Sequence, residues 1–131
     1  MQPDQLAKRV AAATSVRCVI VCAYLGGDVL PEHAFLIRDT LNDLDTDGWW
    51  FVNPGGFIVT FRSTRAGAER ASACQTALTR LSEHTPDLAR LGIGSAEGPV
   101  LCSLASAGDL DTPPLGNVVN EAYRKAIKNA S

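Results

Sequence analysis

The segment WWFVNPGGFIVTFRSTRAGAERASACQTAL, residues 49–78, determines the expected fold of this chain. β-Prone residues stand on both sides of the turn-forming sequence NPGG at 53–56, a pattern typical of a β-hairpin. Ser63 or Thr64 then supplies a helix N-cap, and apolar residues follow near helical spacing as far as Leu81. A hairpin that leads directly into a long helix predicts a mixed α/β domain.

The segments on either side complete the pattern. Residues 16–25 (VRCVIVCAYL) are apolar at nearly every position, which predicts a central strand buried on both faces, and a helix is expected over 31–44. Two short strands, 88–93 and 99–104, and a closing helix over 116–129 are expected after the hairpin and its helix. The order contains a βαββαβ core, so we predict an α/β (α+β) ferredoxin-like fold with an added strand and a C-terminal helix.

Three glycines lie around the junction of the last two expected strands: Gly92 near the end of the first, and Gly94 and Gly98 between the two. A glycine-rich segment suggests a phosphate-binding loop, but no Gly-Lys-Ser/Thr sequence follows and no helix is expected to begin there. We therefore interpret these glycines as turn residues.

Length and composition favour one globular domain spanning residues 1–131, with an N-terminal helix within 1–14. Hydrophobic residues make up 46% of the 131, enough for one core. The formal net charge of -2 argues against nucleic acid or an anionic membrane as a partner. We also expect no membrane-spanning segment and no signal peptide.

Cysteine usage predicts the compartment. The chain has four cysteines and no Cys-x-x-Cys pair, so we expect buried, reduced thiols that act as small core residues. Reduced thiols favour a cytoplasmic location.

Three sequence blocks resemble the class III adenylate and guanylate cyclase domains. Residues 57–78 look like the strand-then-helix block of that family, and residues 90–100 (RLGIGSAEGPV) resemble its Arg-x-Gly-Ile…Gly-x-Val block. Residues 116–124 (GNVVNEAYR) match Gly-x-x-Val-Asn-x-Ala-x-Arg at every fixed position. The resemblance covers residues 16–125 and implies a nucleotide cyclase fold in a degenerate, shortened member of the family.

The resemblance also shows where the chain departs from active members. Those use two aspartates to bind two divalent cations that hold the nucleotide triphosphate. The first position falls on Tyr24, and the second falls on Gly55, or on Gly56 if the gap is placed differently. Neither residue type offers the carboxylate oxygen that a hard cation needs. We therefore predict a pseudo-cyclase that is not an enzyme, binds no metal or cofactor, and serves as a dimerisation, interaction or regulatory module.

Asn120 and Arg124 keep their identity in the third block. A spacing of four residues puts both side chains on one face of the closing helix. In the family the Asn positions the ribose and the Arg neutralises phosphate charge. Two interpretations stay open for this chain: a structural contact, for example across a subunit interface, or a remaining phosphate-binding role.

The resemblance implies a partner as well, because cyclase domains pair as twofold dimers with each active site between two subunits. A homodimer, or a pair with a related cyclase-fold domain, is the expectation. One alternative is a half-site subunit that supplies Asn120 and Arg124 to a metal-competent partner, and another is a nucleotide or small-molecule sensor. The purine-selecting Lys of the family is replaced by Val52 or Asn53, which argues against nucleotide binding.

Overall fold

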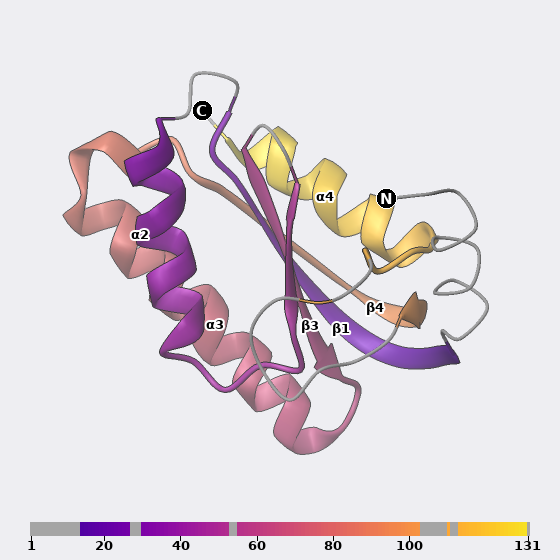
Figure 1. Cartoon of the computed structure of the whole chain (residues 1–131). Helices are drawn as coiled ribbons and strands as arrows, with labels where there is room; N and C mark the ends of the chain where they lie inside the picture. Colours follow the sequence, from indigo (N-terminus) through magenta and orange to yellow (C-terminus); the bar gives the residue numbers. More distant parts are fainter. Residues whose placement is uncertain (1–13, 27–29, 53–54, 103–109, 111–112, 131) are drawn as a thin grey trace.

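The computed structural model describes residues 14–26, 30–52, 55–102, 110 and 113–130, and Figure 1 shows how their elements are arranged. The described strands form one antiparallel sheet with the order β2-β3-β1-β4. The elements are β1 (Thr14–Tyr24), α2 (Pro31–Asn42), β2 (Trp49–Val52), β3 (Gly56–Arg62), α3 (Arg65–His84), the 3-10 helix η1 (Pro86–Leu88), β4 (Gly92–Cys102) and α4 (Asn117–Asn129). This βαββαβ core with a C-terminal helix confirms the predicted fold class.

β1 is the central strand because its side chains are apolar on both faces. Val21 and Ala23 belong to the core between the sheet and helices α2 and α3, whereas Ile20 and Cys22 belong to the core beneath α4. Figure 1 shows the same division, with α2 and α3 on one side of the sheet and α4 on the other. The two cores meet only through the sheet, so β1 stabilises both.

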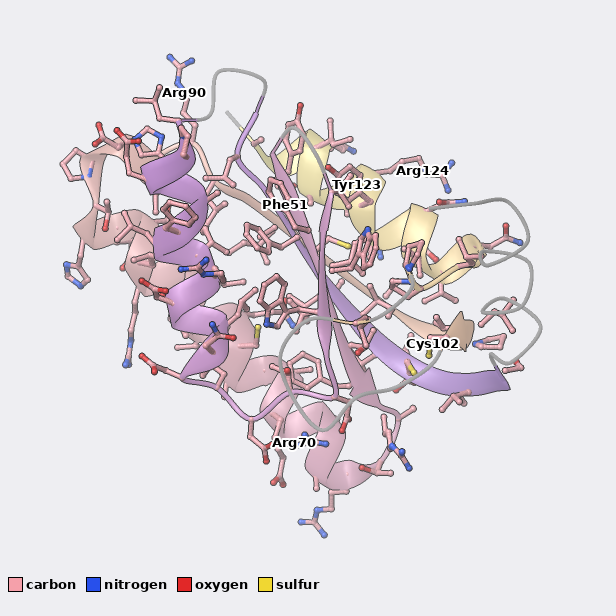
Figure 2. All side chains as sticks on the ribbon, viewed as in Figure 1. Phe51, Arg70, Arg90, Cys102, Tyr123 and Arg124 are labelled. Carbon is pink, nitrogen blue, oxygen red and sulfur yellow. The ribbon has the colours of Figure 1, made fainter. Side chains whose placement is uncertain are left out.

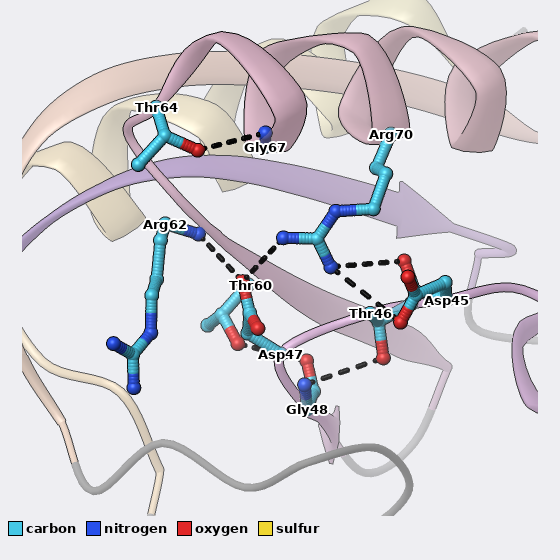
Figure 3. Close-up of polar contacts among 9 residues, drawn as sticks. All are labelled: Asp45, Thr46, Asp47, Gly48, Thr60, Arg62, Thr64, Gly67 and Arg70. Carbon is cyan, nitrogen blue, oxygen red and sulfur yellow. Dashed lines mark hydrogen bonds and ion pairs between the residues drawn. The ribbon is translucent and has the colours of Figure 1, made fainter.

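The acidic turn before β2 anchors α3 to the sheet (Figure 3). Arg70 donates to Asp47 Oδ2 at 3.1 Å, and the backbone N–H of Arg62 donates to the same oxygen at 2.7 Å. The helix begins at the predicted cap, since the Thr64 hydroxyl accepts from the backbone N–H of Gly67 at 2.9 Å. Asp47 therefore has a structural role that joins three chain segments.

The segment before α4 differs from the sequence expectation. One continuous strand, β4, replaces the two short strands predicted at 88–93 and 99–104, and residues 86–88 form the 3-10 helix η1. The added strand of the prediction is therefore wrong for the described part of the chain. The interpretation of the three glycines as turn residues is also wrong, because all of them lie within β4.

The β4 glycines let α4 lie directly on the strand backbone. A Cβ atom added to Gly92 would collide with the carbonyl oxygen of Ala126, and one added to Gly94 would collide with that of Ala122. Glycine permits such a close backbone approach because it has no side chain. These residues are thus required by tertiary packing and not by a turn.

Two hydrogen bonds hold α4 in place along this strand. Lys125 Nζ donates to the Ser95 carbonyl oxygen at 3.1 Å, and Asn129 Nδ2 donates to the Ile93 carbonyl oxygen at 2.8 Å. Both acceptors are β4 backbone groups. The two bonds therefore fix the position of the helix along the strand, in addition to the packing that holds the helix on the strand.

The remaining expectations concern the chain start and the thiols. Residues 1–13 of the predicted N-terminal helix lie outside the described residues, and Thr14 already belongs to β1. All four cysteines are free and buried, as predicted. Among the described residues, no helix is both long and apolar enough to span a membrane.

Replacing Gly94 with Ala should lower the free energy of unfolding by about 2 kcal/mol or more, because the methyl group would meet helix backbone that cannot rotate away. Urea denaturation followed by circular dichroism measures the change. Ser95→Ala, at the next position and facing the other side of the sheet, should change the same quantity by less than about 0.5 kcal/mol. Equal stability of the two variants would contradict the close packing of α4.

Two buried thiols should make the fold sensitive to alkali. Burial raises the pKa of Cys22 and of Cys74 to about 12, whereas an unfolded thiol titrates near about 8.5. The unfolded chain loses these protons first, so stability is full below about pH 8 and falls as pH rises toward 12, by up to about 1.4 kcal/mol per pH unit for each thiol. Denaturation midpoints measured from pH 7 to 11 test this. The Cys22→Ala/Cys74→Ala variant should show a shallower decline, and an unchanged slope would refute the assignment.

Candidate functional site

A groove lies between α4 and the strands β2 and β3. α4 packs on β4 and β1, while β2 and β3 continue the same face of the sheet beyond it. The groove has a cavity volume of about 580 Å³, within the range of about 300–1,000 Å³ typical of small-molecule sites. Its lining residues come from both sides: Val52, Ile58, Asn117, Val119, Asn120, Tyr123 and Arg124.

The strand side of the groove is apolar. Val52 on β2 and Ile58 on β3 pack against the core beneath α4, and Ile58 is buried. Trp50 is the cross-strand partner of Ile58 and therefore lies on the same face of the sheet. Trp49, next to it, is buried on the opposite face, where its Nε1 donates to Asn42 Oδ1 at 3.2 Å.

The helix side of the groove is polar. Asn117, Asn120 and Arg124 recur at three- and four-residue spacing, so they share one face of α4, and all three are exposed. Figure 2 shows the Arg124 side chain extending outward from the helix. The structure thus brings together the predicted pair Asn120 and Arg124, in a groove whose only charged residue among the described lining is Arg124.

Tyr24 and Gly55, the positions aligned with the metal-binding aspartates, lie near each other at one end of the sheet. Tyr24 ends β1 and is the cross-strand partner of Gly56. The next residue, Leu25, donates its backbone N–H to the Gly55 carbonyl oxygen at 2.8 Å. Tyr24 and Gly55 are therefore adjacent in space.

Tyr123 links this end of the sheet to the groove, and the sequence interpretation missed it. Its hydroxyl lies so close to Gly56 that a Cβ atom there would collide with it, and its ring meets the Tyr24 ring edge-on, with centroids 5.9 Å apart. Burial, with smaller contributions from Tyr24 and Cys22, raises the pKa of the Tyr123 hydroxyl. Its position three residues after Asn120 was the available signal, since residues at that spacing share a helix face.

The residues at these positions do not fit the two cations that the sequence resemblance implies. Tyr24, Gly55 and Gly56 provide no carboxylate, and the Tyr123 ring lies against the Gly56 backbone. No three His, Cys, Asp or Glu side chains in the described ranges are grouped closely enough to hold a metal ion. We derive no step through a metal bound by this chain.

Comparison with known proteins identifies the fold. No protein-family model and no curated protein matches the chain. Two solved structures, each of a bacterial light-regulated adenylyl cyclase, match 88% of the chain with TM-scores of 0.54 and identities of 17% and 18%. This chain spans 40% and 41% of their lengths. A third solved structure is of an adenylate/guanylate cyclase/hydrolase from Silicibacter pomeroyi, at 22% identity and a TM-score of 0.49. The match covers 88% of this chain and 72% of the length of that protein. The chain has a class III cyclase-like fold.

This comparison corrects the prediction that the chain is not an enzyme. That prediction is wrong: it rested mainly on Tyr24 and Gly55, whereas the structures that share the fold are of adenylyl cyclases. Two substituted positions within one chain do not establish an inactive protein.

Replacing Asn120 or Arg124 with Ala should change the free energy of unfolding by less than about 0.5 kcal/mol, because both side chains are exposed. Tyr123→Ala should instead lower it by about 2 kcal/mol, since it removes the ring that packs on Gly56 and Tyr24. Thermal and urea unfolding of the three variants provide the measurement. A large loss of stability in the Arg124 variant would mean that this residue supports the fold.

Proposed function

We propose that this chain is a cyclase-type domain that pairs with a second domain of the same fold and contributes Asn120 and Arg124 to a nucleotide site between them. The observation that carries the proposal is the placement of this pair, exposed and side by side on the polar wall of the groove. A purely structural pair would be expected to be buried or bonded, and no ion pair joins Arg124 to another residue of the described ranges.

The two side chains suit different parts of a nucleotide. The planar guanidinium of Arg124 presents several N–H donors that match phosphate oxygens, and it stays charged at any physiological pH. The amide of Asn120 both donates and accepts, as a ribose hydroxyl requires. Their order along α4 places the phosphate contact toward the helix C-terminus and the sugar contact one turn earlier.

The partner supplies what this chain lacks. Since the positions of Tyr24 and Gly55 do not fit cations, the carboxylates of the shared site come from the second domain. Twofold pairing is the commonest symmetry of such assemblies. The apolar strand wall beside the groove supports pairing, because the centre of an interface is its most apolar part.

We further propose a reducing, cytoplasmic setting for this assembly. The buried free cysteines Cys18, Cys22, Cys74 and Cys102 support it, because thiols persist where glutathione keeps them reduced. Experiments on the pair therefore belong in reducing buffer.

A complementation assay tests the proposal. The partner is an adenylyl cyclase catalytic domain that keeps its metal-binding aspartates but has Ala at its own Asn and Arg positions, so that cyclic AMP formation depends on this chain. Wild-type chain should restore activity, and Arg124→Ala should reduce it at least about a hundredfold, the usual effect of removing a group that stabilises transition-state charge.

Arg80→Ala is the matched control, because it removes the same charge from an exposed position on α3, across the sheet. It should leave the restored activity unchanged. If the wild-type chain and Arg124→Ala give equal cyclic AMP formation, the chain is not a donor of this half-site.

A further inference from the structure

The groove has two chemically different walls, and this difference specifies a ligand. One wall is apolar: Val52 and Ile58 on the strands and Val119 in the first turn of α4 have no hydrogen-bonding side chain. Across from the strands stand two amides and the guanidinium of Arg124. A molecule that fills the groove therefore needs an apolar side and a polar side.

Charge sets the polar group of that ligand. Arg124 is the one charged residue among the described residues that line the groove, and none of them is acidic. The positive charge of Arg124 thus attracts an anion, and no negative charge in the described lining repels it. A single guanidinium compensates one anionic group, whereas a polyphosphate would keep negative charges without partners in the absence of cations.

The shape of the groove wall determines the apolar part of the ligand. One wall is the surface of a β-sheet, continued by the indole of Trp50 beside Ile58, and Tyr123 stands at the hairpin end with its hydroxyl against Gly56. A flat ring covers such a surface with few rotatable bonds to immobilise, so little entropy is lost on binding. An edge of a purine turned toward Val52 and Ile58 would face two aliphatic side chains and would lose its hydrogen bonds to water.

We propose that this groove binds a planar aromatic ring bearing one anionic group, such as an aryl carboxylate, without a metal ion and without the partner domain. The ring lies on the Val52–Ile58 wall and the anion bonds to Arg124. The inference rests on the proposed function in assigning Arg124 to an anion, but it concerns the isolated chain and names a ligand class that the shared nucleotide site does not require.

Calorimetric titration of the whole chain in EDTA tests the inference with 2-naphthoate and its neutral isostere 2-naphthamide. Naphthoate should bind with one site per chain and at least fivefold more tightly than the amide. Arg124→Ala should reduce naphthoate affinity to that of the amide, whereas Arg80→Ala should change neither. Val52→Asp, which puts a carboxylate into the strand wall, should abolish naphthoate binding while circular dichroism stays unchanged.

Adenosine monophosphate, titrated under the same conditions, distinguishes an aryl acid from a nucleotide as the source of the ring and the anion. It should bind more weakly than naphthoate. Equal affinities of naphthoate and naphthamide, an Arg124→Ala variant that binds naphthoate normally, tighter binding of the nucleotide, or binding that appears only with magnesium would each overturn the inference. The complementation assay supplies partner and cations, so its result is independent: naphthoate binding without complementation refutes only the shared site, and complementation without naphthoate binding refutes only this ligand class.

Discussion

Contact between the backbone of α4 and the backbone of β4 is the constraint on which the rest of the molecule depends. Gly92 and Gly94 have no side chains to separate the two elements, and the carbonyl groups of Ala122 and Ala126 occupy the space where a Cβ would be. The helix is consequently held over one side of the sheet. α4 sits over β4 and β1, and the groove lies beside it, where Val52 on β2 and Ile58 on β3 stand across from the polar residues of the helix.

The two faces of the sheet have correspondingly different roles. On one, α2 and α3 cover a continuous apolar core, and the ion pair between Arg70 and Asp47 fastens α3 to the segment that enters β2. On the other, a single helix leaves room for a ligand or a partner. Each face thus has its own buried core, and the polar residues that line the groove lie on the exposed side of α4.

Local sequence patterns predicted those structural elements that are determined by residues close together in the chain. The two-sided apolar pattern of β1, the strand pairing of the β2–β3 hairpin and the Thr64 cap all act over a few residues, and the structure confirms each of them. The glycines of β4 were misinterpreted because turn propensity is a local property, while their actual cause is contact with a helix that follows much later in the chain, such as that of Gly94 with Ala122. The Asn120 and Arg124 pair was predicted from helix periodicity, but the groove and Tyr123 depend on how α4 is positioned on the sheet. The expectation of inactivity was wrong because it was argued from single aligned positions, whereas the solved structures that share the fold are of adenylyl cyclases.

The contact of Tyr123 with Gly56 joins α4 to the β2–β3 hairpin at one end of the sheet. The Tyr123 ring lies between the Tyr24 ring on β1 and the backbone of Gly56 on β3. Tyr123 also directly precedes Arg124 in the chain. Arg124 is therefore one residue away from the contact that ties α4 to β3, and this contact fixes where the guanidinium stands relative to the strand wall of the groove.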